Sequence, residues 1–249
     1  ARLTLDVYKE MTNDLFVNQP LSNTTGFNNM AINAGKMSNK GIEALLAVDV
    51  VRNQDFDVSL GLNHAININK IEDLGLVSEY ELGTFIIRKG LPYGSHYTYN
   101  YLGANPDDGR PTYYAQDGTT KVYALAEAGR FADFGTYLPK HVGGFNADFR
   151  YKRFSVGLLF SYQFDVVRSN NVRNWITDGT RGNTGAITQS RELIDNQWLK
   201  PGDNKFFPSP AYAKGFTNSD LQDAKFLRLR NLNVAYSLPE IKYAGNTVV

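Results

Sequence analysis

Three aspartates in one glycine-containing stretch have the side chains best suited to hold a metal ion. Asp107, Asp108 and Asp117 lie beside Gly109 and Gly118, and carboxylate oxygens are ligands that Ca²⁺ prefers. The spacing differs from that of an EF-hand, and the closing Glu of such a loop is missing. Asp-Asp-Gly and Gln-Asp-Gly are also ordinary turn sequences. A Ca²⁺ site near these aspartates is one interpretation, and two turns without metal is the interpretation that we adopt.

The histidines and the absence of catalytic motifs argue against an enzyme. His64, His96 and His141 are the only histidines, and no two stand at the spacing of zinc ligands. The lack of cysteine excludes a disulfide scaffold, a thiol nucleophile and a Cys-ligated metal. No Gly-x-Ser-x-Gly, Walker A or dinucleotide fingerprint occurs. We therefore predict no catalytic residue, no metal and no other cofactor.

Aromatic residues in the long loops are the candidate binding residues. Sugars and peptides both stack on aromatic rings, because both offer apolar C–H surface beside hydrogen-bonding edges. The alternative is that the rings pin the loops to one another or to a partner. We predict contact with substrate or with a partner protein for Tyr97, Tyr99, Tyr101, Tyr113, Tyr114, Trp175 and Trp198.

The elements that carry these loops show strict two-residue alternation. In 154–166 the even positions are Phe, Val, Leu or Tyr, and most odd positions are Ser, Gly or another polar residue. Successive side chains of a strand point to opposite faces, so this run predicts a strand with one apolar and one small, polar face. The pattern recurs at 3–7, 42–50, 56–69, 145–151 and 232–238.

Strand length favours a membrane barrel over a soluble sheet. Ordinary strands average about 5–6 residues, and a membrane-spanning strand needs about 9–11; two runs here alternate for about 13 residues. Ser, Gly, Asn and Ala on the polar face suit a crowded or water-filled lumen. We predict an all-β fold of eight to ten antiparallel transmembrane barrel strands, with helix limited to a turn or two at 218–224. A soluble β-sandwich remains the alternative.

Connections between the predicted strands are short at one end and long at the other. Lys152-Arg153 and residues 52–55 each form a tight turn, whereas 18–31, 72–140 and 168–225 are long loops rich in Gly, Pro, Asn and Asp. Arg228 and Arg230 occupy even-numbered positions, and the even-numbered positions further along the same predicted strand are apolar. We expect them to meet lipid head groups or a partner chain.

Composition excludes several classes of protein. The 249 residues carry 26 Lys and Arg against 25 Asp and Glu, a net charge of +1, which provides no field for nucleic acid. No run approaches the 18 apolar residues of a membrane helix, and the mean hydropathy is −0.36. The N-terminus lacks the features of a signal peptide. We expect the sequence to be part of a longer chain.

Six segments, in order along the chain, carry recognisable motifs: 8–15, 26–43, 90–97, 103–111, 143–146 and 224–239. Residues 33–43 fit the pattern "NxGxxxNKGIE", and Phe226-Leu-Arg-Leu-Arg-Asn fits "FLRLkN". Together these segments resemble the SusC/RagA-type TonB-dependent outer-membrane transporters.

This resemblance implies a 22-stranded barrel with a lumenal plug, of which residues 1–249 form a C-terminal, partial barrel domain without the plug and the closing strands. The tight turns would be periplasmic, and the loops 72–140 and 168–225 would be extracellular. The implied function is nutrient import across the outer membrane of a Gram-negative bacterium of the Bacteroidota. The implied partners are a SusD-like surface lipoprotein, TonB acting through a plug and N-terminal segment outside this chain, outer-membrane lipid, and an oligosaccharide or oligopeptide substrate.

Two other functions stay open at this point. The chain would be a stand-alone small barrel, such as a porin or adhesin, if it closed on itself. It would be a secreted carbohydrate-binding β-sandwich if a second layer covered the apolar face of its strands.

Overall fold

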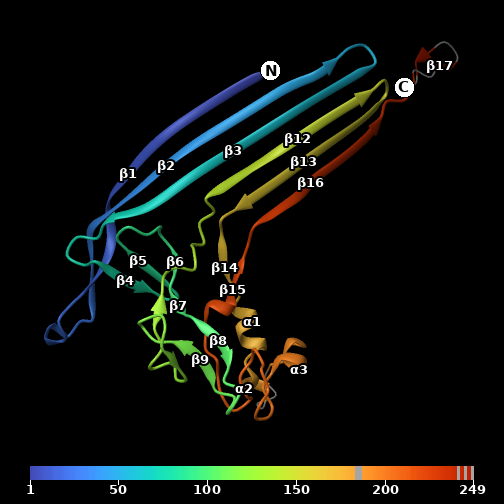
Figure 1. Ribbon diagram of the computed structural model, residues 1–249. Helices are drawn as coiled ribbons and strands as arrows, with labels where there is room; N and C mark the ends of the chain where they lie inside the picture. Colours follow the sequence, from blue (N-terminus) through green and yellow to red (C-terminus); the bar gives the residue numbers. More distant parts are fainter. Residues whose placement is uncertain (183–186, 240–241, 244–245, 248–249) are drawn as a thin grey trace.

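The computed structural model describes residues 1–182, 187–239, 242–243 and 246–247. Its main element is a six-stranded antiparallel sheet with the order β1-β2-β3-β12-β13-β16 (Figure 1). The strands are β1 (Arg2–Pro20), β2 (Asn29–Arg52), β3 (Phe56–Asp73), β12 (His141–Tyr151), β13 (Phe154–Phe164) and β16 (Phe226–Tyr236). Among the described residues the sheet stays open, because β1 and β16 form its two edges.

The segments between these strands fold into a second part at one end of the sheet, here called the loop domain (residues 74–140, 165–182 and 187–225) (Figure 1). Its strands are β4 (Glu79–Leu82), β5 (Phe85–Arg88), β6 (Ser95–His96), β7 (Thr98–Tyr99), β8 (Tyr101–Ala104), β9 (Pro111–Tyr114), β10 (Lys121–Val122), β11 (Arg130–Phe131), β14 (Val167–Ser169) and β15 (Leu221–Asp223). Its short helices are α1 (Asn171–Ile176), α2 (Gly179–Gly182) and α3 (Glu192–Asn196), with a 3-10 turn at Asn218–Asp220. Outside the loop domain lie a 3-10 turn at Asn23–Thr25 and the short strands β17 (Lys242–Tyr243) and β18 (Asn246–Thr247).

Strand register confirms the two predicted faces of the sheet. Leu158 of β13 is opposite Ala147 and Leu232, and Phe160 is opposite Phe145 and Leu229. We call the side that carries these residues the apolar face and the opposite side the polar face. The Phe145 and Phe160 rings stack with centroids 4.4 Å apart.

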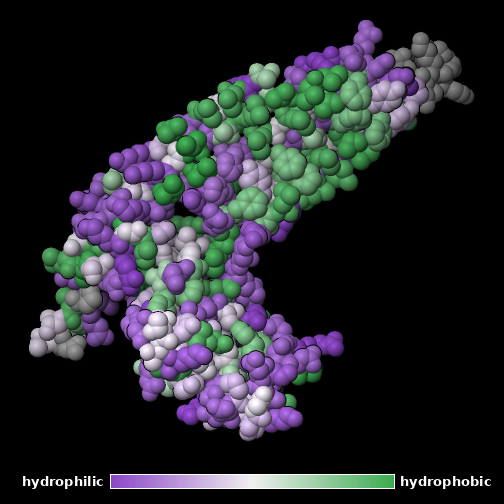
Figure 2. All heavy atoms as spheres, in the orientation of Figure 1, coloured by the Kyte–Doolittle hydropathy of each residue, from purple (hydrophilic) through white to green (hydrophobic). Residues whose placement is uncertain are grey.

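The apolar face is uncovered, which contradicts the sandwich alternative. Val7 is 74% exposed, Leu5 62% and Leu232 57%, whereas a sandwich would bury such residues under a second sheet. Figure 2 shows hydrophobic residues gathered over the long strands and hydrophilic residues dominating the loop domain. An apolar surface of this extent is typical of contact with lipid or with another protein.

Aromatic side chains lie at both ends of the apolar face. Near the tight turns, Phe56 contacts Phe149 edge-on at 4.9 Å, and at the loop end Tyr162 lies 5.8 Å from the His64 ring. The nine residues from Phe154 to Tyr162 extend about 26 Å along the strand, or about 20 Å across a membrane for strands tilted by roughly 40°. That spacing is close to the roughly 25 Å apolar band of outer-membrane barrels.

A β-bulge in β16 corrects the expectation for its arginines. Leu159 is opposite Asn231 and Phe160 is opposite Leu229, so Arg230 is the extra residue. The bulge inverts the alternation. Arg228 and Arg230 therefore lie on the polar face, where Arg230 Nε donates to Ser161 Oγ at 2.8 Å, and not among lipid head groups.

Both tight turns are confirmed, but other element predictions need correction. The 18–31 loop shrinks to residues 21–28, because β1 and β2 extend to Pro20 and from Asn29. In the described part of the chain, six long strands replace the expected eight to ten, and residues 221–223 are strand instead of helix. Within the described ranges, no helix combines the length and apolarity needed to cross a bilayer.

Candidate functional site

A ladder of asparagines connects the polar face to the loop domain. Asn67 and Asn69 of β3 both donate to Asn39 Oδ1, at 3.4 and 2.8 Å. Tyr8 Oη donates to Asn67 Oδ1 at 3.1 Å, and the backbone N–H of Tyr93 donates to Asn69 Oδ1 at 2.7 Å. Period-two alternation places these amides side by side on adjacent strands. They form a surface of donors and acceptors beneath the loops.

The ends of the long strands also share a small hydrophobic core with the loop domain. Val17 from β1, Ile71 from β3, and Leu74 and Ile87 from the loop domain pack together and are buried. These residues hold the β1–β2 hairpin against the loop domain, which fixes the position of the loops over the sheet.

Two of the predicted contact tyrosines lie inside the loop domain. Tyr113 is fully buried, and its hydroxyl donates to the carbonyl of Lys214 at 2.6 Å. The Tyr101 ring lies 5.6 Å from that of Tyr113, and its hydroxyl donates to the carbonyl of Phe206. Burial raises the pKa of both phenols. These rings brace segments about 100 residues apart in sequence, so a contact role with substrate does not fit them.

A buried ion pair fastens the C-terminal half of the loop domain. Lys214 Nζ donates to Asp220 Oδ2 at 2.6 Å, and both side chains are almost completely buried. Asp220 Oδ2 also accepts from the backbone N–H of Thr217 and from Asn174 Nδ2. Burial lowers the pKa of the Lys214 ammonium, although Asp220 opposes the change. Through the Asn174 amide, Asp220 also joins α1 to the segment that leads into β15.

Trp198 is buried as well and packs against a loop backbone. Its Nε1 donates to the carbonyl of Pro106 at 3.0 Å. Gly109 lies under the indole with φ +72°, and a Cβ at that position would collide with the ring. Trp198 therefore holds the 105–110 turn in place, and a contact role with substrate does not fit it either.

Alanine at Gly109 should destabilise the loop domain by about 1–3 kcal/mol. Both the left-handed backbone and the clash with Trp198 contribute. Gly118→Ala is the matched control, because Gly118 has the same φ of +72° and only an ordinary contact at 3.8 Å; it should lose only about 1 kcal/mol. Hydrogen exchange of residues 103–114 measures the difference, and equal effects would contradict the packing role of Trp198.

Four predicted contact residues keep exposed ring surface. Tyr97, Tyr99 and Tyr114 are half-buried, and the Arg130 guanidinium lies 4.3 Å from the Tyr97 ring centroid. Trp175 on α1 is 52% exposed. The structure thus divides the seven aromatic candidates into three that brace the loop domain and four that remain accessible.

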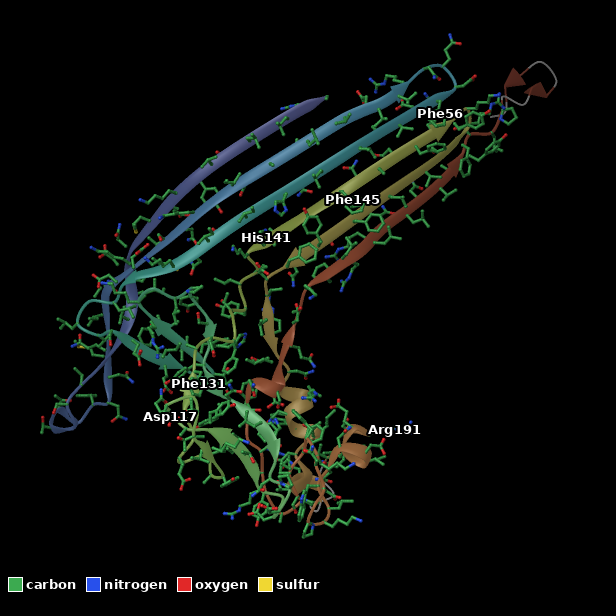
Figure 3. The ribbon with its side chains drawn as sticks, viewed as in Figure 1. Phe56, Asp117, Phe131, His141, Phe145 and Arg191 are labelled. Carbon is green, nitrogen blue, oxygen red and sulfur yellow. The ribbon has the colours of Figure 1, made fainter. Side chains whose placement is uncertain are left out.

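The three aspartates proposed for Ca²⁺ lie in two separate turns. Asp108 forms a 2.7 Å ion pair with Arg110, and Asp107 is exposed. Asp117, far from the sheet in Figure 3, accepts from the backbone N–H groups of Thr119 and Thr120, both at 2.9 Å. In the described part of the chain, no cluster of three or more His, Asp or Glu is arranged to hold a metal.

Acid should loosen the turn that Asp117 holds. Hydrogen bonds from the Thr120 hydroxyl and the two backbone N–H groups lower the pKa of Asp117 from 3.8 to about 2. The stabilisation is thus fully present above pH 3.8 and is lost as the pH falls through about 2. Hydrogen exchange of residues 113–122, corrected for the intrinsic pH dependence, should accelerate over this window. Asp117→Asn should abolish the change, and a pH-independent wild type would contradict it.

His64 and His141 are far apart in the sequence but lie close together on the apolar face. His64 Nδ1 lies 2.8 Å from the Tyr162 hydroxyl, and His64 Nε2 lies 3.5 Å from His141 Nδ1. His141 Nε2 lies 3.5 Å from Asp165 Oδ2. Figure 3 shows His141 at the loop end of β12, with Phe145 further along the strand. His64 therefore lies on the apolar face near the loop end of the sheet.

A cavity of about 820 Å³ lies at the junction of the sheet and the loop domain. Its walls are mainly apolar, and charged side chains of Lys140, Asp165, Asp223 and Lys225 also line it. The apolar lining includes Ile68, Pro92, Phe134, Leu138, Phe164 and Val166. Its volume is in the range of pockets that hold small ligands. No sequence motif pointed to it, because its lining comes from five segments that are separated in the sequence.

Known proteins similar to this chain are receptors and transporters. No protein-family model matches the chain. Two curated proteins of Formosa agariphila match it: TonB-dependent receptor P39 at 27% identity over 94% of the chain, and TonB-dependent receptor P3 at 29% over 98%. The chain spans 27% and 26% of their lengths, so it corresponds to about a quarter of each relative.

Solved structures agree with the sequence relatives. The RagAB peptide transporter superposes with a TM-score of 0.83 and 26% identity, over 98% of this chain and 28% of that chain. The RagAB peptide importer in its 'open-open' state gives 0.82 and 25%, over 99% and 27%. The long strands, the uncovered apolar face, the six motif segments and these similarities lead to one assignment. The chain is similar to TonB-dependent transporters of the SusC/RagA type, and its fold is that of part of their β-barrel.

Proposed function

We propose that this chain supplies a sector of wall and external loops to an outer-membrane barrel that imports oligopeptides or oligosaccharides. The supporting observation is that the same six strands carry two opposite surfaces. One is an uncovered apolar face bounded by aromatic rings, and the other is a polar face whose asparagines bond to the loop domain. A barrel wall that contacts lipid on its outside and polar cargo on its inside needs one apolar face and one polar face.

The mechanism proposed for the whole protein is binding and gated release without covalent chemistry. A SusD-like lipoprotein would cover the loop domain, and TonB would act on a plug supplied by another part of the protein. The half-buried Tyr97, Tyr99 and Tyr114 and the exposed Trp175 are the residues that we propose to contact cargo or lid. The relatives named as receptors and transporters support transport over catalysis.

The open sheet gives no support to a stand-alone barrel. In the described residues β1 and β16 do not pair with each other, and unpaired strand edges are unfavourable in lipid. The similarity to peptide transporters of known structure supports a peptide cargo. The relatives from Formosa agariphila support a location in the outer membrane of a member of the Bacteroidota.

Native mass spectrometry of the protein purified in mild detergent from its own membrane tests this proposal. A barrel chain several times heavier than 27.9 kDa, with a lipoprotein partner and a retained peptide or glycan, is the expected result. Retained peptides would select peptide import, and retained glycans would select glycan import. A lone water-soluble chain of these 249 residues would contradict the proposal.

A further inference from the structure

Three adjacent strands share a pattern at the loop end of the apolar face. The apolar runs of β1, β2 and β3 on this face end at Val7, Ile42 and Ile68. In each strand the next residue on the same face is an exposed lysine, namely Lys9, Lys40 and Lys70. No bulge interrupts the register between the apolar runs and these lysines. The three side chains therefore form a row across the sheet, here called the lysine belt.

The belt carries positive charge that the described residues do not neutralise. Lys9 and Lys40 are directly opposite each other, and like charges in that position are destabilising. Lys70 is opposite Ser38, two residues from Lys40, and pairs with Glu72 at 3.0 Å. Within the described ranges, neither Lys9 nor Lys40 has a carboxylate at ion-pairing distance. Three lysines and one glutamate leave two positive charges.

The opposite end of the sheet has a different arrangement. Arg52 lies 3.5 Å from Asp57 and 3.7 Å from Asp49, and Arg150 lies 3.7 Å from Asp57. Arg52 and Arg150, near the tight turns, thus have carboxylate partners within the chain. The unpaired lysines at the loop end, in contrast, require an anion from outside these residues.

We propose that the lysine belt binds the phosphate groups of an anionic lipid in the leaflet at the loop end of the barrel. A lysine just beyond an apolar run lays its stem along the apolar surface and raises its ammonium to the level of the head groups. A phosphate between Lys9 and Lys40 replaces their repulsion with two charge-assisted hydrogen bonds. The inference rests on the proposed placement of the barrel in a membrane.

Lipid binding to the native full-length protein in detergent tests the belt. The probe is monophosphorylated lipid A, compared with a neutral glycolipid that lacks phosphate and with inorganic phosphate. Substituting all three belt lysines (K9Q, K40Q and K70Q) should weaken binding of the phosphorylated lipid by roughly tenfold or more. The matched control replaces the exposed loop-domain residues Lys89, Lys121 and Lys200 with Gln and should bind within about twofold of wild type.

Replacement of the three belt lysines by Arg should retain binding, which separates loss of charge from loss of folding. Equal affinity of the belt and control variants would overturn the proposal. So would equal binding of the neutral glycolipid, or displacement of the lipid by inorganic phosphate at the same concentration. Cargo uptake by the belt variant should stay near wild type, so a failed lipid test leaves the transport proposal intact. A protein that needs no detergent would contradict both.

Discussion

Arginine at Leu62 should destabilise the folded protein by about 2–4 kcal/mol, whereas arginine at the neighbouring Asn63 should change stability by less than about 1 kcal/mol. Leu62 lies on the apolar face, opposite Leu46 and Phe145, and is 42% exposed. In a membrane this exposed surface contacts hydrocarbon, where a guanidinium is poorly solvated. Asn63 is the next residue of the same strand and lies on the polar face.

Urea unfolding of the native protein in lipid vesicles measures both variants. The two substitutions add the same side chain one residue apart, so the difference between them reports the environment of each face. A soluble sheet would tolerate Leu62→Arg, because surface substitutions usually change stability by less than about 0.5 kcal/mol. Equal stability of the two variants would therefore contradict the assignment of the apolar face to lipid.

Alanine at Asp220 should destabilise the loop domain by about 3–5 kcal/mol and leave the strands folded. The substitution leaves the ammonium of Lys214 buried without its 2.6 Å partner. It also removes the acceptor for the Thr217 N–H and the Asn174 amide. Loss of a buried partner is more damaging than loss of an exposed one, because the remaining charge cannot return to water.

Limited proteolysis of the loop domain measures this effect. The heat-modifiable migration of the barrel in gel electrophoresis should stay unchanged, which shows that the strands remain folded. Asp195→Ala is the matched control, since Asp195 is exposed, and it should change stability by less than about 0.5 kcal/mol. Lys214→Met combined with Asp220→Leu should recover part of the loss, because no buried charge then remains. Equal protease resistance of D220A and D195A would contradict a stabilising role for the pair.

The sheet was largely predictable from the sequence because the pattern that defines its faces lies within each strand. Alternation in 154–166 and 56–69 identified the two faces, and Lys152-Arg153 identified a turn, since side-chain direction in a strand follows from position alone. The bulge at Arg230 escaped prediction. An extra residue in one strand is defined only by its partner strand. The inverted alternation from Leu229 to Leu232 was nevertheless a visible sign of it.

The loop domain was less predictable because its contacts are distant in sequence. Tyr113 and Trp198 are residue types that often occur in binding sites. In the structure they are buried and donate hydrogen bonds to the carbonyls of Lys214 and Pro106. The pairing of His64 with His141 likewise depends on the β3–β12 register. Whether an aromatic ring braces the loops or is free to bind a ligand depends on its exposure. That exposure is set by how the loops pack together, which the sequence pattern does not show.

A cysteine scan of β13 tests the central assignment most directly. The chain contains no cysteine, so a single spin-labelled cysteine at each position from 154 to 164 reports only its own surroundings once any cysteines elsewhere in the native protein are replaced. In lipid vesicles, even positions should be accessible to oxygen dissolved in the bilayer and odd positions to a water-soluble nickel complex, with a period of two residues. Equal access of the water-soluble complex to both sets would contradict a membrane-facing apolar surface and with it the barrel account.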